Sequence, residues 1–381
     1  MQRKPQKIWK HVNSKIASVP HIGNLKVTEG TNTMLVTDDL DKAEAFSDYF
    51  STVFTVETNI DSIHFYNVMA DNFMPEITLT EMEVGKKLSE LNVNKSFGPD
   101  LVHPRVLYEL RCVIVGPLTN IFNDSLHSGI IPNDWKNSNV TVIFKKGKKD
   151  CVENYRPISL TCISCKIMES IIRDYIMSYF KVQNLFSNFQ YGFIKGRSTV
   201  LQLLKVFDAW TSILDEGCQV DVIYTDFEKA FDKVPHQRLL CKLYGYGVNH
   251  RVINWIRNFL CFRQQAVRIN GVYASPKPVL SGIPQGSVLG PLLFVIYIND
   301  LPDICREYAI TFLYADDAKL FRQIRDELDC SNLNTAFDSV HDWCVKWQMS
   351  LNIDKCQVLS ISHGKSSKVT FDYGLRMRTV R

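Results

Sequence analysis

The chain has no apolar stretch long enough to cross a bilayer. Its longest apolar run, residues 288–298, is interrupted by Gly290 and Pro291 and falls far short of the roughly 20 residues that a membrane span requires. The N-terminus is polar and lacks the apolar segment of a secretory signal. These absences predict a soluble intracellular protein with no membrane partner. No feature of the sequence chooses between nucleus and cytoplasm.

Paired cysteines are scarce, although the chain has 11 cysteines in all. Only Cys162 and Cys165 form a C-x-x-C pair, and no second pair stands at the spacing of a zinc site. The others are scattered, many of them in apolar surroundings where a free thiol acts as a small hydrophobic group. The pattern therefore predicts neither a structural zinc ion nor a disulfide framework, and it is typical of a reducing compartment.

A strong excess of one charge is also absent. Lys and Arg total 44 and Asp and Glu total 40, which leaves a net charge of +4 and does not by itself indicate a nucleic-acid partner. The basic residues are unevenly placed, however. Residues 1–28 contain no acidic residue, and a second basic cluster holds Lys145, Lys146, Lys148 and Lys149. Both clusters are suited to phosphate groups or simply to solvent.

Apolar residues are plentiful enough for a large core. Of the 381 residues, 45% are hydrophobic and 22% are charged, a balance typical of two or three folded domains or subdomains. Helical spacing is present at 38–54, 80–91, 101–128, 163–179, 198–216, 286–299 and 337–347. Strand-like segments are 140–144, 219–227, 310–314 and 318–321. Residues 1–35 lack sustained periodicity, and 55–75 resemble a linker. This mixture predicts an α/β or α+β enzyme.

Three aspartates stand at the ends of predicted strands. Asp226 closes the segment V-D-V-I-Y-T-D, and Asp316 and Asp317 occupy a tight turn between two apolar strands. Taken singly, these residues are typical of solvated turns. Taken together, carboxylates from a strand end and an adjacent hairpin can hold the metal ions that assist in-line attack on a phosphate. Acidic groups between apolar strands are also costly unless a cation compensates them. Metal-dependent phosphoryl chemistry is therefore one option.

Seven short segments occur in an order known from one protein family. They are K-S-F-G-P-D (95–100), Y-R-P-I-S-L (155–160), Q-Y-G-F-I-K-G-R-S-T (190–199), D-F-E-K-A-F-D-K-V-P-H (226–236), S-G-I-P-Q-G-S-V-L-G-P (281–291), Y-A-D-D (314–317) and L-N-I-D-K-C (351–356). This ordered set resembles the reverse transcriptases of non-LTR, LINE-like retrotransposons, near the jockey and chicken-repeat types. The resemblance extends over residues 76–363. Phe97 departs from the family pattern, which has a small residue or proline there.

The resemblance implies an α+β fold of the right-hand polymerase type, with fingers and palm. It also implies an RNA-directed DNA polymerase that joins deoxynucleotides to a primer 3′-hydroxyl by a two-metal mechanism. The implied partners are an RNA template, a DNA primer and deoxynucleoside triphosphates. The implied cofactor is a pair of Mg²⁺ ions, which Mn²⁺ could replace. Asp226 and Asp316 would be the main metal ligands, with Asp317 as a supporting third.

The resemblance also implies roles for residues that would contact the nucleotide. Phe231 would exclude a ribose 2′-hydroxyl. Arg156 would bind the triphosphate through its planar fork of donors, with Lys145 or Lys146 adding a second charge. Without the resemblance, these residues would be explained as a core phenylalanine and as solvated basic side chains.

Four more positions gain implied roles. Gln285 and Gly286 would pack against the nascent base pair, because glycine permits close approach of the backbone. Lys355 would protonate the leaving pyrophosphate as a general acid, and Arg197 would help to hold template or primer. The structural alternatives are a turn before a buried helix for the first two and surface charges for the others.

The resemblance divides the chain into parts. Residues 1–75 are an N-terminal extension or linker with one helix, 76–197 correspond to fingers and 198–363 to palm. Residues 364–381 correspond to a truncated start of the region after the palm, with a strand expected from 368, and the thumb is missing. An inactive remnant that only binds nucleic acid therefore stays open as an alternative. A maturase-like splicing factor is less well supported, because no maturase segment follows the palm. Oligomeric state and template specificity are not predicted.

Overall fold

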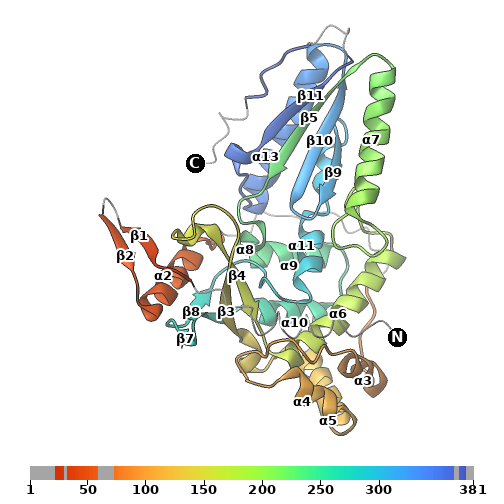
Figure 1. The fold of residues 1–381 in the computed structure, drawn as a ribbon. Helices are drawn as coiled ribbons and strands as arrows, with labels where there is room; N and C mark the ends of the chain where they lie inside the picture. Colours follow the sequence, from red (N-terminus) through yellow and green to blue (C-terminus); the bar gives the residue numbers. More distant parts are fainter. Residues whose placement is uncertain (1–21, 30–31, 59–72, 364–368, 375–381) are drawn as a thin grey trace, which may run out of the picture.

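The computed structural model describes residues 22–29, 32–58, 73–363 and 369–374 of the chain. Most of the basic N-terminal tail and most of the expected linker lie outside these residues. Helices and sheets are mixed throughout (Figure 1), as the α+β prediction required. None of the helices in these ranges combines the length and the apolar character that a membrane crossing would need.

A four-stranded antiparallel sheet forms one end of the molecule (Figure 1). Its strand order is β11-β5-β10-β9, with β5 at Gln219–Asp226, β9 at Ile310–Tyr314, β10 at Asp317–Ile324 and β11 at Gln357–Ile361. Helix α7 (Thr199–Asp215) packs on the face that presents Val222, and α13 (Glu327–Trp347) packs on the face of Ile223. Successive side chains of a strand point to opposite faces. Because both faces are covered, β5 is almost wholly buried.

A second sheet lies among the remaining helices. Its order is β4-β3-β6-β7, and β8 also pairs with β6. The strands are β3 (Asn137–Phe144), β4 (Tyr155–Leu160), β6 (Arg263–Ile269), β7 (Val272–Tyr273) and β8 (Lys277–Val279). Strands β3 and β4 are antiparallel neighbours. Their connection carries the lysine cluster at 145–149 and the short 3₁₀ helix η2 (Val152–Asn154). This hairpin therefore presents the lysines away from the core.

One apolar core packs the remaining helices together and against the four-stranded sheet. The helices are α3 (Glu81–Ser89), α4 (Pro104–Glu109), α5 (Arg111–Ser128), α6 (Ile163–Val182), α8 (Ala230–Lys233), α9 (His236–Gly245), α10 (His250–Leu260), α11 (Gly290–Ile298) and α12 (Leu301–Cys305), with 3₁₀ turns η1 (Asn133–Lys136) and η3 (Ile353–Lys355). Helix α11 is buried on all sides, in keeping with its uniformly apolar sequence. The same core includes residues of α3, α6, α13 and β10.

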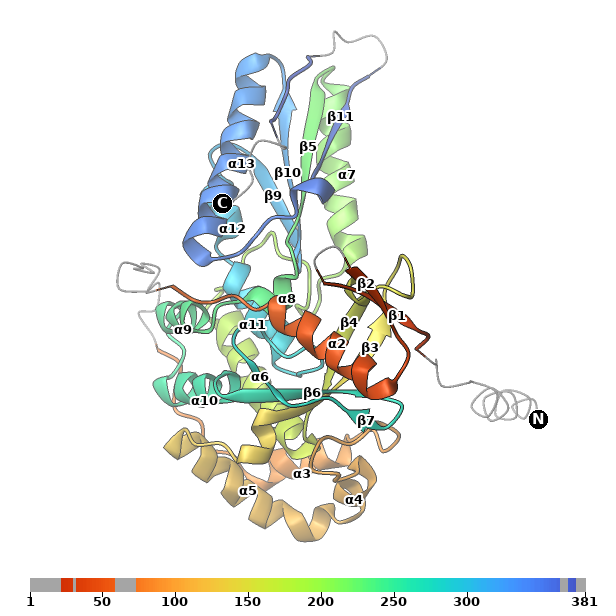
Figure 2. The same cartoon turned by 90° about the vertical axis from the view of Figure 1, so that its left-hand side faces the viewer.

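The N-terminal part packs against the second sheet. Strands β1 (Leu25–Glu29) and β2 (Asn32–Val36) pair with each other, and α2 (Asp39–Thr52) follows. Figure 2 shows α2 beside β6 and β7. The ring of Phe46 meets that of Tyr155 on β4 at 5.0 Å. The sequence predicted the helix but not the hairpin, whose two strands of five residues lie in a stretch without sustained periodicity.

The elements that the sequence predicted are largely confirmed, with four differences. The helix expected over 101–128 is divided at Leu110 into α4 and α5. Thr80 caps the N-terminus of α3 and forms a capping box with Glu83. Residues 286–289 form a turn, so the helix expected from 286 begins at Gly290, and Asp317 belongs to β10 instead of the turn. Residues 369–374 form no strand, and the expectation from 368 onward was wrong for them. Val369 is instead held by hydrogen bonds with the Gln219 side chain.

Candidate active site

A cleft of about 640 Å³ is lined by segments from distant parts of the chain. They are the β3–β4 hairpin, the loop at Phe193, the end of β5 with the turn after it, the loop before α11, the β9–β10 turn and residues 352–355. This volume is in the range of sites for small molecules. Every site residue predicted from the sequence lines the cleft except Arg197.

The three aspartates meet at the ends of adjacent strands. Strands β5 and β10 are antiparallel, and their register places Asp317 opposite Asp226. Asp316 stands just before β10, in a tight turn where Ala315 has a φ of 54°. Asp226 and Asp316 are 90 residues apart in the sequence, and the pairing of β5 with β10 brings them close together in space.

The carboxylates destabilise one another's charge. Burial, followed by the charge of Asp226, raises the pKa of Asp316 above its usual value. Burial and the charges of Asp316 and Asp226 raise the pKa of Asp317 in the same way. Arg156 and Lys145 partly offset the effect at Asp316, and Lys319 does so at Asp317. Burial first, and then mutual repulsion, thus disfavour the ionised form of these carboxylates.

These carboxylates fit a divalent cation by their chemistry. Among the described residues, no three His, Cys, Asp or Glu side chains are arranged as a complete metal cluster. Magnesium, however, is usually bound by one or two carboxylates together with substrate phosphates. Oxygen donors whose negative charge is poorly compensated would be stabilised by such an ion. The donor set therefore suits a metal that binds together with a phosphate ligand.

Lys355 is joined to the first of these carboxylates. Its Nζ donates to Asp226 Oδ2 at 2.6 Å. The backbone of the same segment is tied to β5, because the amide of Asn352 donates to Asp226 O at 2.7 Å. Both contacts hold residues 352–355 against the end of β5. A cation that binds Asp226 Oδ2 would therefore have to displace the ammonium group of Lys355.

The opposite wall of the cleft is basic. Lys145 and Lys146 follow β3, and Arg156 lies on β4, where it pairs with Ile143. Burial, followed by the charges of Arg156, Lys355 and Lys146, lowers the pKa of Lys145, and Asp226 opposes this shift. A group of cations that disfavour one another's charge is suited to a polyanion such as a triphosphate.

Phe231 and Gln285 line the cleft between these two walls. The Phe231 ring stacks on Phe294 of α11 with 4.6 Å between centroids. The Gln285 amide donates to Asp232 Oδ1 at 2.8 Å. Gly286 has a φ of +117°, and a Cβ there would stand 2.5 Å from Ser159 O. The close approach predicted for this glycine is thus to strand β4, and its contact with a base pair stays a prediction.

Sequence reasoning missed two acidic residues, one that lines the cleft and one that is fully buried outside its lining. Asp232 holds Gln285, and burial raises the pKa of its carboxyl group. Glu169 of α6 is fully buried, and its Oε2 accepts hydrogen bonds from Ser287 Oγ, Val288 N and Leu289 N at the start of α11. The aspartate was visible within the D-F-E-K-A-F-D-K-V-P-H segment, whereas no sequence signal links Glu169 to α11.

Arg197 lies outside the cleft and has a different set of contacts. Its Nη1 donates to Ser187 O at 2.5 Å and to Gln190 O at 2.6 Å. Gln190 in turn supports the aspartate turn, because its Oε1 accepts from Gly192 N at 2.7 Å and from Ala315 N at 3.0 Å. The structure therefore places Arg197 next to the loop that supports Asp316, and not with the other predicted residues.

We expect Gln190→Leu to lower the free energy of unfolding by about 2–4 kcal/mol, because it leaves two buried N–H donors without their acceptor at similar side-chain volume. Urea unfolding followed by circular dichroism measures this loss. Gln323→Leu is the matched control, since the Gln323 amide donates to Glu216 at an exposed contact. Equal losses in the two variants would contradict the supporting role of Gln190.

Comparisons with known proteins identify the family of this chain. Residues 143–373 match the family model of the reverse transcriptase (RNA-dependent DNA polymerase). The RNA-directed DNA polymerase from mobile element jockey of Drosophila melanogaster is 29% identical over 302 residues, which cover 77% of this chain and 33% of that protein. The probable RNA-directed DNA polymerase from transposon BS of the same species is 27% identical, over 84% of this chain and 37% of that protein.

The chain thus spans about a third of the length of these relatives. Among solved structures, an apo telomerase from Candida tropicalis, truncated from its C-terminal domain, aligns at 12% identity and a TM-score of 0.47, over 64% of this chain and 53% of that chain. The family match includes the lysine cluster and six of the seven motif segments, from 155–160 to 351–356. The chain belongs to the reverse transcriptase (RNA-dependent DNA polymerase) family, in its non-LTR, LINE-like group.

Proposed function

We propose that this chain is the polymerase core of a non-LTR retrotransposon, and that it adds deoxynucleotides to a primer 3′-hydroxyl on an RNA template. One observation carries the proposal. Three aspartates, a basic wall and Phe231 come from distant motifs and line a single cleft of nucleotide size. An acidic floor opposite cationic groups suits a metal-bound triphosphate, and family membership gives the reaction.

The proposal assigns fingers to residues 76–197 and palm to 198–363. The four-stranded sheet with the aspartates would be the centre of the palm, and the β3–β4 hairpin would be the tip of the fingers. The two parts share a sheet, because β6 from the palm range pairs with β3. The thumb-less end expected from the sequence falls on residues 364–381, of which the structure describes 369–374.

Asp226, Asp316 and Asp317 would hold two divalent cations, Mg²⁺ or Mn²⁺, which would supply positive charge for the attacking hydroxyl and the leaving group. The protein's own groups would do the rest. Arg156, Lys145 and Lys146 would bind and orient the triphosphate. Lys355, once displaced from Asp226, would be free to donate a proton from Nζ to the departing pyrophosphate.

Phe231 would select deoxynucleotides. Its stacking on Phe294 fixes the ring beside the cleft, where it would collide with a ribose 2′-hydroxyl. We expect Phe231→Val to raise the incorporation of ribonucleotides relative to deoxynucleotides by about 10- to 100-fold, because it removes a steric exclusion worth a few kcal/mol. Steady-state kcat/KM for matched rNTP and dNTP pairs gives this ratio. Phe207→Val on the exposed face of α7 is the control, and an unchanged ratio for Phe231→Val would reject the assignment.

Primer extension tests the proposed function as a whole. The 381-residue chain is incubated with an RNA template, an annealed DNA primer, dNTPs and Mg²⁺. Elongation that depends on the RNA template and stops on chelation of the metal supports the proposal. Binding of template–primer without elongation would instead support the alternative of an inactive nucleic-acid-binding remnant.

A further inference from the structure

The segment that follows α2 is docked on two of the motifs that line the cleft. The amide of Thr55 donates to Ser281 Oγ at 2.7 Å, and Thr55 Oγ1 donates to Lys233 O at 2.9 Å. Ser281 Oγ itself donates to Asp232 O at 2.8 Å. One threonine therefore contacts both the turn after Asp226 and the loop that leads to Gln285. The sequence had placed this part of the chain in a linker.

Glu57 caps helix α9 from a distant part of the chain. The helix begins at His236 after Pro235, which makes no side-chain capping hydrogen bond. The first N–H groups of a helix have no partner within it. Glu57 Oε2 accepts from Gln237 N, and Glu57 Oε1 accepts from Arg238 N, both at 2.9 Å. A carboxylate in this position also interacts favourably with the helix dipole.

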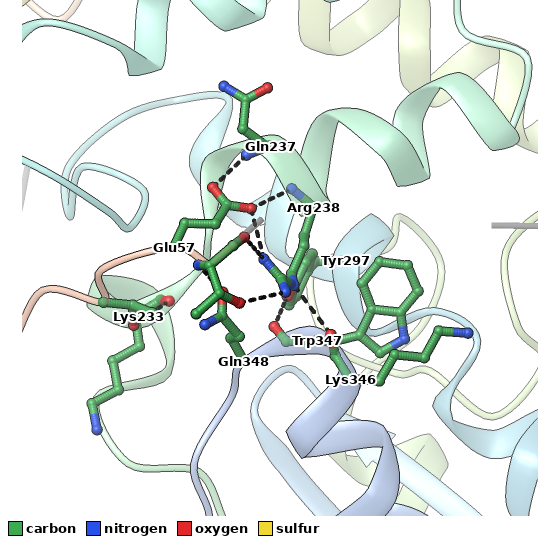
Figure 3. A network of polar contacts seen from close by, with 10 residues as sticks. Glu57, Lys233, Gln237, Arg238, Tyr297, Lys346, Trp347 and Gln348 are labelled. Atoms are coloured by element: carbon green, nitrogen blue, oxygen red, sulfur yellow. Dashed lines mark hydrogen bonds and ion pairs between the residues drawn. The ribbon is translucent and has the colours of Figure 1, made fainter. Parts of the chain in front are cut away.

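Arg238 joins this cap to the end of α13 (Figure 3). Its side chain is 4% exposed, and its guanidinium donates to Glu57 Oε1 and to Thr58 O and Oγ1, each at 3.2 Å. Its Nε donates to Lys346 O at 3.1 Å. A buried guanidinium is stable only when its donors are paired in this way. We call Thr55, Glu57, Thr58, Arg238 and Lys346 the clasp.

The clasp is connected to the cleft by short paths. Helix α9 follows the segment that connects it to Asp226. This segment includes α8, which carries Phe231 and Asp232. Asp232 accepts the hydrogen bond from Gln285 at 2.8 Å. Among the described residues, the contacts of the clasp thus lead to Phe231 and Gln285, the groups proposed to contact the nucleotide.

We propose that Glu57 is a positioning residue for the nucleotide side of the cleft. It acts through α9 and through the Ser281 loop on Phe231 and Gln285. The proposal rests on the proposed polymerase function, and it makes residues 55–58 part of the polymerase core. The reasoning is that side chains at a reacting centre must be held within fractions of an ångström, and that this precision comes from their supporting contacts.

Glu57→Ala tests the proposal in the full chain. We expect KM for the incoming dNTP to rise roughly tenfold and selection against rNTPs to weaken by a similar factor, while kcat at saturating dNTP changes by less than about threefold. Loss of folded protein alone would lower the apparent kcat and leave KM and selectivity unchanged. Glu57→Gln keeps the length of the side chain and one oxygen acceptor. Its KM for the dNTP should therefore lie between those of the wild type and Glu57→Ala.

Glu44→Ala is the matched control, because Glu44 lies in the same N-terminal part and accepts hydrogen bonds from Ser275 N and Oγ, both at 2.7 Å. KM and selectivity should stay at wild-type values in this variant. Amide hydrogen exchange gives a readout without catalysis: residues 231–238 and 281–285 should exchange faster in Glu57→Ala. Wild-type KM and selectivity in Glu57→Ala, equal changes in Glu44→Ala, or unchanged exchange would each overturn the proposal. Absence of extension by the wild-type chain would reject the polymerase function instead.

Discussion

Asp316→Asn is expected to lower kcat for nucleotide addition by more than about a thousandfold, because it removes a charged oxygen donor where the metal ions and the transferred phosphate would meet. It should not unfold the protein. Burial and the charge of Asp226 raise the pKa of Asp316, so the charged group is held in the folded state at a cost. Removing the charge should leave the free energy of unfolding unchanged or slightly higher. Single-turnover primer extension and thermal unfolding of the same preparation measure the two effects.

Metal binding gives this prediction a second readout. Saturating Mg²⁺ with template–primer and dNTP should raise the Tm of the wild-type chain, since a ligand that binds only the folded state stabilises it. Asp316→Asn should show a smaller rise. Asp208→Asn, an exposed aspartate of α7, is the control and should behave like the wild type. Substantial activity in Asp316→Asn would remove this residue from the reaction.

The sequence predicted the elements that have strong periodic patterns, and every predicted site residue except Arg197 lines the cleft. The roles of these residues stay predictions. Helix α2, the capping box of α3 and the strands around Asp316 follow from local patterns, because amphipathic spacing and capping act within a few residues. The ordered motifs assigned Asp226, Arg156 and Gln285 to one site, and the three residues line the same cleft. Only the resemblance to the family relates these residues, which lie far apart in the sequence, to one site.

Contacts between distant segments could not be predicted in the same way. The cap that Glu57 gives to α9 joins positions about 180 residues apart, and nothing near either residue signals it. The bond between Lys355 and Asp226 has the same character. Arg197 shows the opposite case, since a motif residue expected at the nucleic acid is bonded to backbone carbonyl groups of the supporting loop. Sequence patterns identify residue types, while tertiary packing selects their partners.

Lys242 is a buried lysine outside the cleft. Its side chain is fully buried on α9, and its Nζ donates to Asp300 Oδ1 and Tyr297 O, each at 2.5 Å. The rings of Trp347 and Trp343 lie 3.9 and 4.6 Å from the ammonium group. The lysine thus links α9 to α11, α12 and α13, and cation–π attraction adds to its ion pair.

Lys242→Met is expected to lower the free energy of unfolding by about 3–5 kcal/mol, because it leaves the carboxylate of Asp300 without its buried partner. Urea unfolding of this variant and of Lys181→Met, an exposed lysine of α6, measures the difference.

The effect of the Lys242→Met substitution on the free energy of unfolding should depend on pH. Burial lowers the pKa of Lys242 from 10.5 to about 8, against the opposing charge of Asp300. Between these values the unfolded chain binds a proton that the folded chain has released, so the wild type gains stability as pH rises. The gap between wild type and Lys242→Met should therefore widen from about pH 8 to about pH 10. A gap that stays constant over this range would show that Lys242 stays charged in the folded protein.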